Sequence, residues 1–267
     1  MIKVIVCGGC GKMGSKVAQL IYQNKDMGLL GIIESPSHPD IGKVWGRSLG
    51  IGETGILIKD DLEEIIQNAD QIVEFTNPQV SLEHLEIIAK YKKPMIMGTT
   101  GFSSKEIEII NRLAQGIPFL LSPNMSLGVN LLFKLAAETA AALSDDYDIE
   151  IVETHHRFKK DAPSGTAKKL AQEIAKAKGI NLDEAAIYGR EGIIGERGKG
   201  EICIHSIRGG DITGEHTVIF TAMGERLELT HKAHSRDTFA YGTIQAIKFM
   251  ESKPAGFYEM KDVLKIK

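Results

Sequence analysis

The stretch Ile2-Lys3-Val4-Ile5-Val6-Cys7-Gly8-Gly9-Cys10-Gly11-Lys12-Met13-Gly14 opens the chain and decides its fold. The apolar run Ile2–Val6 leads directly into glycines at the spacing GxxGxxG, and an amphipathic segment, 12–24, follows. Such glycines permit a tight turn after a strand, close approach of the backbone to a pyrophosphate, and close packing of helix on strand. The stretch therefore predicts the first βαβ unit of a dinucleotide-binding fold, and a merely structural glycine turn is the alternative.

An acidic residue stands where such a unit binds the adenosine ribose. Glu34 ends the second apolar run, 29–33, twenty residues after Gly14, and a carboxylate there can accept hydrogen bonds from the ribose hydroxyls. Ser35 and Pro36 follow it instead of arginine, so a 2′-phosphate would meet a carboxylate without an adjacent guanidinium. This pattern predicts NADH as the preferred cofactor and leaves NADPH possible.

The glycine loop has two other possible interpretations, a phosphate loop and a cysteine site. A Walker A phosphate loop is excluded because Met13, and not serine or threonine, follows Lys12. Cys7 and Cys10 form a CxxC motif, but the third cysteine, Cys203, is far away in sequence and no second pair exists. A zinc site needs further ligands and a redox pair is expected at a helix start, so we interpret the motif as a coincidence and predict no metal.

Short apolar runs and amphipathic segments alternate through the rest of the first half. Buried strands are expected at 56–58, 72–75, 95–97 and 119–121, and helices at 62–67, 79–90 and 103–115. This βαβα rhythm predicts a doubly wound parallel sheet of Rossmann type. Ligands of such sheets bind outside the carboxyl ends of the strands. The segments at these ends are Phe75-Thr76-Asn77-Pro78, Gly98-Thr99-Thr100-Gly101-Phe102 and Ser122-Pro123-Asn124-Met125-Ser126, although each could be ordinary turn chemistry.

The second half has a different pattern. Helices are expected at 127–143, 165–178 and 237–250, and strands at 149–155, 201–207, 216–222 and 226–232. Glycine-containing links, Gly209-Gly210 and Met223-Gly224, are typical of antiparallel neighbours. A segment with five glycines, 189–200, is expected to be a mobile loop. These features predict an α+β second domain with a mainly antiparallel or mixed sheet.

One run in this second half is chemically distinctive. The run is His155-His156-Arg157-Phe158-Lys159-Lys160-Asp161-Ala162-Pro163-Ser164-Gly165-Thr166-Ala167. It joins two imidazoles and three cations to a helix start, whose unpaired N–H groups and positive dipole end attract carboxylate or phosphate. His155, His156 or Lys159 could donate a proton to an anion bound there. The run predicts a site for a small acid that undergoes proton-coupled chemistry.

Composition limits the class of protein. The chain has 267 residues, 43% hydrophobic and 25% charged, with a net charge of -3, which is typical of a globular protein of one or two domains and argues against nucleic acid as the main partner. The most apolar helical stretch is interrupted by Lys134 and Glu138, so no membrane partner is expected. Met1 leads straight into the first strand, and the three cysteines give no disulfide framework. We therefore expect no signal peptide and a cytoplasmic location.

The motifs together resemble one family, the 4-hydroxy-tetrahydrodipicolinate reductases, also called dihydrodipicolinate reductases. The resemblance covers essentially the whole chain. Its motifs are GGCGKMG at 8–14, EFTNP at 74–78, GTTGF at 98–102, SPNMSLGVN at 122–130, ETHHRFKKDAPSGTA at 153–167, SIRGGDITGEH at 206–216 and HKAHSRDTFAYG at 231–242. The long signature at 153–167 makes this resemblance specific.

The resemblance implies a reductase of the diaminopimelate and lysine pathway. It implies NAD(P)H-dependent reduction of a cyclic imine dicarboxylate, with a dinucleotide-binding domain at 1–126 and 236–267 and a substrate-binding and tetramerisation domain at 127–235. It implies an acid/base role for His155, proton donation by Lys159, and a homotetramer. The substrate would be held by His156, Gly165 and Thr166, and the dinucleotide by Gly8, Gly9, Cys10, Gly11, Lys12, Met13, Glu34, Gly98, Thr99, Thr100, Ser122, Pro123, Asn124 and Met125.

The chain departs from the family pattern at two positions, and two alternative functions are possible. Ser122 stands where many relatives have alanine, and Lys160 where relatives are often apolar. The alternatives are a related dehydrogenase acting on a linear diamino acid, which the intact dicarboxylate-binding cluster disfavours, and a non-catalytic dinucleotide sensor, which has no need of His155 and Lys159. Which of these two residues donates at which step stays open.

Overall fold

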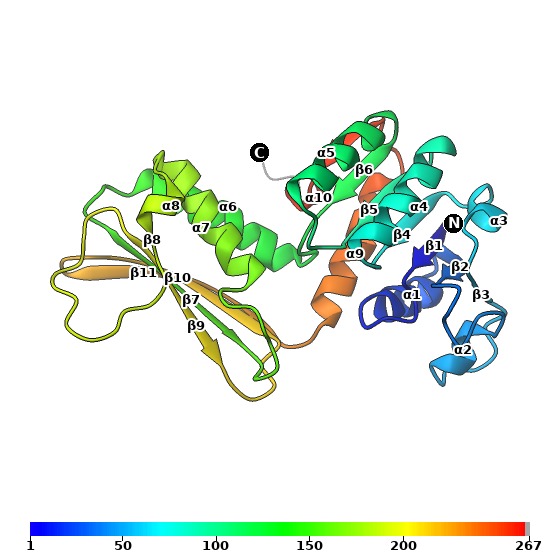
Figure 1. The fold of residues 1–267 in the computed structure, drawn as a ribbon, viewed down its shortest axis with the longest axis horizontal. Coiled ribbons are helices and arrows are strands. Elements are labelled where there is room, and N and C mark those ends of the chain that lie inside the picture. Colours follow the sequence, from blue (N-terminus) through cyan, green and yellow to red (C-terminus); the bar gives the residue numbers. More distant parts are fainter. Residues whose placement is uncertain (265–267) are drawn as a thin grey trace. The chain divides into compact units, whose positions relative to one another are not determined.

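The computed structural model describes residues 1–264, which form two compact units (Figure 1). The first unit comprises Met1–Ser126 and the segment from Phe239 onward, and the second comprises Leu127–Thr238. The second unit is thus inserted between two segments of the first. The chain returns to the first unit at Phe239.

The first unit contains a seven-stranded sheet. Its strands are β1 (Ile2–Cys7), β2 (Met27–Ile33), β3 (Ile58–Lys59), β4 (Gln71–Glu74), β5 (Met95–Met97), β6 (Pro118–Leu121) and β12 (Gly256–Tyr258). They lie in the order β12-β6-β5-β4-β1-β2-β3, and every neighbouring pair is parallel. The predicted doubly wound parallel sheet is confirmed. Strand β12, which the sequence pattern did not predict, extends one edge.

Helices connect these strands. They are α1 (Gly14–Gln23), α2 (Trp45–Ser48), α3 (Glu63–Ile66), α4 (Pro78–Lys90), α5 (Ser104–Leu113), the 3₁₀ turn η1 (Ala114–Gly116), α9 (Asp237–Met250) and α10 (Met260–Val263). Local chemistry fixes the helix starts: Pro78 occupies the first turn of α4, and Ser103 with Glu106 forms a capping box on α5. The core beneath them is apolar and includes Ile5, Ile72 and Phe119, all fully buried.

The carboxyl ends of the central strands meet at one edge of the sheet. The register pairs Cys7 with Glu74, Glu74 with Met97, and Met97 with Leu121. The chain builds outward from β1 to β2 and β3, and then in the opposite direction from β4 to β6. This reversal between β1 and β4 is the switch point at which open α/β sheets bind ligands.

The second unit contains a five-stranded mixed sheet. Its strands are β7 (Asp148–His155), β8 (Ala186–Ile187), β9 (Ile202–Arg208), β10 (Gly214–Ala222) and β11 (Glu225–Ala233), in the order β11-β10-β7-β9-β8. The predicted mixed sheet is confirmed, and the Met223-Gly224 link does join antiparallel neighbours. The prediction for Gly209-Gly210 is wrong, because β7 lies between β9 and β10, parallel to the former and antiparallel to the latter.

Helices α6 (Leu127–Ala142) and α7 (Gly165–Lys178) lie together over one face of this sheet, with α8 (Leu182–Ala185) beyond them (Figure 1). Side chains alternate along β7, so Ile149, Ile151, Glu153 and His155 are all buried on the helix-covered face. Helix α7 ends at Gly179 in the left-handed conformation, as glycine after a helix favours. The buried end of β7 therefore lies close to α7.

The glycine-rich segment expected to be a mobile loop is anchored by two arginines. Arg190 contacts Glu150 and Glu201, both at 3.0 Å, and Arg197 contacts Asp148 at 2.6 Å and Glu150 at 3.2 Å. These partly buried pairs fix its two ends to β7 and to the start of β9. No helix within residues 1–264 is both long enough and apolar enough to span a bilayer.

Candidate active site

The glycine loop after β1 folds in a way that side chains would prevent. Gly8 has φ 77°, and a Cβ there would lie 2.7 Å from the carbonyl oxygen of Phe75. A Cβ on Gly14 would lie 2.0 Å from the carbonyl oxygen of Gly8. Helix α1 begins at Gly14 without a side-chain cap at Met13. A tight turn into an uncapped helix start is the arrangement that binds a pyrophosphate.

Beside this loop lies a cavity of about 460 Å³, a volume typical of small-molecule sites. Glu34 reaches it from the end of β2, and its Oε1 accepts a hydrogen bond from the Cys10 N–H at 2.7 Å. The described residues lining the cavity include four carboxylates and neither lysine nor arginine; the set is Gly8, Gly11, Glu34, Ser35, Pro36, Asp60, Asp61, Leu62, Phe75, Thr76, Asn77, Val80, Glu83, His84 and Ile87. The geometry fits the adenosine half of a dinucleotide.

The remaining predicted cofactor residues lie at the same edge of the sheet but do not line this cavity. Gly98 follows β5, and a Cβ there would meet the Phe75 ring at 2.2 Å. Thr99 accepts a hydrogen bond from Ser81, Oγ to Oγ1, at 2.8 Å. Ser122 follows β6, and its Oγ donates to the Asn124 carbonyl at 2.8 Å. Pro123 and Met125 belong to this same turn, whose contact with a dinucleotide stays a prediction.

The cysteines of the CxxC motif are both free thiols. Burial, and then the nearby Glu74 carboxylate, raises the pKa of Cys7 well above its usual value. Burial, followed by the charge of Glu34, raises the pKa of Cys10 to about 12. Redox chemistry needs a thiolate, so these environments agree with the interpretation of the motif as a coincidence.

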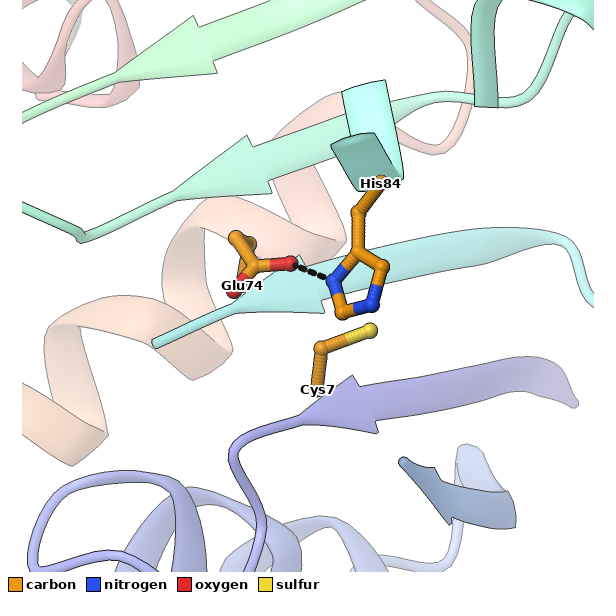
Figure 2. A group of neighbouring side chains, drawn as sticks. All are labelled: Cys7, Glu74 and His84. Carbon is orange, nitrogen blue, oxygen red and sulfur yellow. Dashed lines mark hydrogen bonds and ion pairs between the residues drawn. The ribbon is translucent and has the colours of Figure 1, made fainter. Parts of the chain in front are cut away.

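Figure 2 shows that His84 from α4 points toward Glu74 and Cys7, at the ends of β4 and β1. The His84 Nδ1 and Glu74 Oε2 atoms are 2.7 Å apart, and the potential ligand atoms of all three residues lie within 4.8 Å of one another. Glu150, Cys203 and His205 form a similar group in the second unit. There the carboxylate is already paired with arginines, and the absence of a metal stays a prediction for both groups.

In the second unit, His155 is held at the end of β7. Its Nδ1 is 2.5 Å from Oε2 of Glu153, a fully buried carboxylate two residues earlier on the same strand face. Glu153 also accepts hydrogen bonds from the Ser164 N–H at 3.0 Å and from both terminal nitrogens of Arg208. Burial opposes ionisation of Glu153, but the hydrogen bonds from His155 and Arg208 outweigh it and hold its pKa well below the usual range.

Ser164 joins this cluster to the start of α7. Its Oγ accepts a hydrogen bond from the Ala167 N–H at 3.2 Å, so it is the N-cap of the helix, and it lies 3.1 Å from Nε2 of His216. The His216 ring meets that of His155 edge to face at 5.2 Å. Burial, and then the charge that His155 can carry, lower the pKa of His216 to about 3. His216 is therefore neutral near pH 7.

Lys159 and His156 complete the cluster. The Lys159 Nζ lies 2.8 Å from Asp161 Oδ1, and its hydrogen bond lowers the pKa of that carboxyl group. Nδ1 of His156 is buried without a hydrogen-bond partner among the described residues. Gly165 and Thr166 form the first turn of α7. The run 155–167 thus carries titratable side chains and a helix start, and the proton-donating role of His155 and Lys159 stays a prediction.

The sequence interpretation missed four residues of this cluster: Glu153, Ser164, Arg208 and His216. The even spacing of Glu153 and His155 on a strand and the position of Ser164 just before a helix were available signals. Arg208 and His216 were not accessible in that way, because they reach Glu153 and Ser164 only through the pairing of strands distant in sequence.

Comparison with known proteins agrees with this geometry. The dihydrodipicolinate reductase N-terminus model matches residues 2–125, and the C-terminus model of the same family matches residues 128–264. The chain belongs to the dihydrodipicolinate reductase family. The predicted membership is confirmed, and with it the class of the protein as an oxidoreductase with a nucleotide-binding N-terminal half.

Individual members of the family match over their full length. The chain is 52% identical over 264 residues to a 4-hydroxy-tetrahydrodipicolinate reductase of Syntrophus aciditrophicus (strain SB), covering 99% of this chain and 98% of that one. It is 45% identical to one from Citrifermentans bemidjiense, covering 99% of each. Among solved structures, a dipicolinate-bound dihydrodipicolinate reductase from Paenisporosarcina sp. TG-14 matches with a TM-score of 0.78 and 26% identity, covering 100% of both chains.

Proposed function

We propose that this chain reduces 4-hydroxy-tetrahydrodipicolinate to tetrahydrodipicolinate with NAD(P)H, a step in diaminopimelate and lysine biosynthesis. The observation that carries the proposal is the His155 cluster, in which an oriented imidazole and Lys159 adjoin the start of α7 in a member of this family. The dipicolinate bound to a structural relative is a planar analogue of such a cyclic dicarboxylate. The first unit binds the dinucleotide and the second binds the substrate.

The substrate carries two carboxylates, which need N–H donors and cations. Gly165 and Thr166 supply main-chain N–H groups at the positive end of α7, and His156 supplies an imidazole nitrogen. The Lys159 ammonium group forms an ion pair with an exposed aspartate, Asp161, at 2.8 Å. Because such an exposed pair contributes little stability, Lys159 can leave Asp161 and pair with a substrate carboxylate. These contacts hold the ring with its reacting carbon near His155.

The reaction takes up a hydride and a proton and releases water. Bound reduced nicotinamide supplies the hydride, and the chain supplies the proton and the positive field that stabilises the developing negative charge. His155 and Lys159 are the two proton donors within this cluster, since His216 is kept neutral and turned toward Ser164. The loop at Gly8–Gly14, Glu34 and the turns at Gly98–Thr100 and Ser122–Met125 hold the cofactor.

The direct test is the loss of NADH absorbance when enzymatically generated 4-hydroxy-tetrahydrodipicolinate is added to the protein. We expect turnover, and His155→Ala and Lys159→Met should each lower kcat on the order of 10²–10⁴-fold without changing the Kd for NADH. Lys160→Met is the matched control, because this neighbouring lysine is exposed and should leave kcat within about twofold. Absence of turnover in the unmodified protein would overturn the proposal.

NADH is the preferred cofactor in this proposal. The four carboxylates lining the cavity, Glu34, Asp60, Asp61 and Glu83, would face a 2′-phosphate with no lysine or arginine among the described lining residues. Repulsion between these carboxylates and the 2′-phosphate disfavours NADPH binding. The KM for NADPH should therefore exceed that for NADH by about tenfold or more. An equal or lower KM for NADPH would contradict this preference.

A cytoplasmic homotetramer completes the proposal. The support is the sheet face opposite α6 and α7, which carries Ile207, half exposed, beside Val152 and Ile219. Glu150 and its arginine partners share this face, so it offers the mixture of aliphatic and charged side chains that a subunit interface can bury. Light scattering coupled to size-exclusion chromatography should give about four times the 29.2 kDa chain mass; a monomer would contradict the tetramer without affecting the proposed reaction.

A further inference from the structure

We propose that Glu153, clamped by Arg208, is a positioning residue that keeps the proton of neutral His155 on Nδ1 and so presents Nε2 to the substrate. This inference rests on the proposed function, because it assumes that His155 binds a second proton at Nε2, keeps the one on Nδ1, and delivers the Nε2 proton to the substrate. It adds a role for two residues that lie outside the run 155–167. It also defines which nitrogen of His155 does the chemistry.

Hydrogen-bond donors surround the Glu153 carboxylate. Both carboxylate oxygens are saturated by N–H donors. Oε1 accepts from Ser164 N at 3.0 Å and from Arg208 Nη2 at 2.7 Å, and Oε2 accepts from Arg208 Nη1 at 2.9 Å and faces His155 Nδ1 at 2.5 Å. An ionised carboxylate has no hydrogen to give. His155 Nδ1 must therefore carry the proton.

The other nitrogen of His155, Nε2, has different surroundings from Nδ1. Gly214 lies against it, and a Cβ at that position would be 3.0 Å from Nε2. Glycine therefore leaves this side of the ring clear of side-chain atoms. The neighbouring His216 turns its own Nε2 toward Ser164 Oγ, 3.1 Å away, so that nitrogen is engaged elsewhere. Nε2 of His155 is the atom left for proton exchange.

Arg208 holds the Glu153 carboxylate in place. Its two-point contact fixes the plane of the Glu153 carboxylate and balances its buried charge. The same guanidinium donates to the carbonyl oxygen of Asp161 at 2.7 Å. Arg208 thus ties the carboxylate that orients His155 to the loop that carries Lys159.

An isosteric amide at position 153 would change this pattern of donors and acceptors. In Glu153→Gln the side chain has one acceptor and one donor group in place of two acceptors. If the amide NH₂ group took the Oε1 position, it would face two other donors, Ser164 N–H and Arg208 Nη2. At the Oε2 position it would oppose only Arg208 Nη1 and would donate to His155 Nδ1. The second orientation has fewer conflicts, so Glu153→Gln should move the His155 proton to Nε2.

The primary experiment is ¹⁵N NMR of the histidine-labelled protein at pH 9, where an imidazole is neutral. The His155 signal is assigned by its loss in His155→Asn. We expect the Nδ1–H tautomer in the unmodified protein and the Nε2–H tautomer in Glu153→Gln. An Nε2–H tautomer in the unmodified protein would overturn the proposal, whether or not any variant folds.

The kinetic experiment tests whether Glu153 acts through His155. Glu153→Gln should lower kcat on the order of 10- to 100-fold, with KM for NADH unchanged. Added to His155→Asn, it should cause no further loss, because a positioning residue has nothing left to position. Multiplied losses in the double variant would contradict the proposal.

Glu150→Gln is the matched control. Glu150 lies on the same strand but on the opposite face, and it too contacts a histidine, His205, and an arginine, Arg190. It should leave the His155 tautomer unchanged, and a shift as large as that in Glu153→Gln would overturn the proposal. If the unmodified protein fails to turn over the substrate, the proposed function fails while the tautomer measurement still decides the role of Glu153.

Discussion

Glu34 and Cys10, which are 24 positions apart, are joined by a hydrogen bond of 2.7 Å from the Cys10 N–H to Oε1 of the carboxylate. The bond links the end of β2 to the glycine loop. It fixes the carboxylate before any cofactor arrives, so ordering Glu34 adds little to the entropic cost of binding. Glu34 also lines the cavity, so we expect its remaining acceptor positions to bind the two ribose hydroxyls of the cofactor.

Replacing this carboxylate should therefore change cofactor choice. In Glu34→Gln we expect the ratio of KM for NADPH to KM for NADH to fall about tenfold, since a hydrogen bond to a charged group contributes about 1.5–3 kcal/mol. Steady-state kinetics with both cofactors measures the ratio. Glu108→Gln, an exposed glutamate of the same unit, should leave it unchanged; an unaltered ratio in Glu34→Gln would remove Glu34 from the cofactor site.

Gly14→Ala should damage the cofactor site through the backbone. Its Cβ would lie 2.0 Å from the Gly8 carbonyl oxygen, so the loop must shift. We expect the Kd for NADH, measured by fluorescence titration, to rise at least about tenfold and stability to fall by about 1–3 kcal/mol. Gly116→Ala places its Cβ in open space and is the control. Unchanged NADH binding in Gly14→Ala would show that the loop does not hold the pyrophosphate.

Ser164→Ala should separate capping from chemistry. Loss of the N-cap of α7 should cost about 1 kcal/mol of unfolding free energy, and loss of the contact with His216 should disturb the His155 cluster. We expect kcat to fall severalfold, on the scale of one lost hydrogen bond. Ser103→Ala removes the cap of α5 in the other unit and should reduce stability alone. Equal kinetic effects in both variants would argue against a role of Ser164 in the cluster.

His216 should make the second unit sensitive to acid. Its pKa is about 3 in the folded protein and about 6.5 when unfolded, so the unfolded chain binds more protons between these values. Stability is therefore full above pH 6.5 and falls as the pH drops toward 3, by about 2 kcal/mol at pH 5. Denaturant unfolding at pH 8 and pH 5 measures this difference. The stability difference between pH 8 and pH 5 should shrink in His216→Asn but not in His234→Asn, which alters an exposed histidine. An equal difference in the unmodified protein and both variants would contradict the role of His216.

Local signals in the sequence predicted much of this fold. The bounds of α7 were predictable because Ser164 caps its start and Gly179 ends it, and the glycine loop has a chemical reason for each of its glycines. The position of β9 next to β7 was not predictable, because pairing between distant strands leaves no mark in local periodicity. The contact of Glu153 with His155 was open to prediction from their even spacing on one strand, but its contact with Arg208, 55 positions away, was not. Strand β12 has only three residues, too few to show a period.

The chain leaves the first unit after Ser126 and re-enters it at Phe239, which sets an order of events during synthesis on the ribosome. The second unit emerges whole before the first can close. The Gln71 amide then donates to the Ile247 carbonyl at 2.9 Å, Gly242 packs against the Met125 carbonyl, and β12 pairs with β6. The first unit is thus completed by residues that follow the second unit in the chain, and a nascent chain stopped before 239 would hold a complete second unit and an incomplete first one.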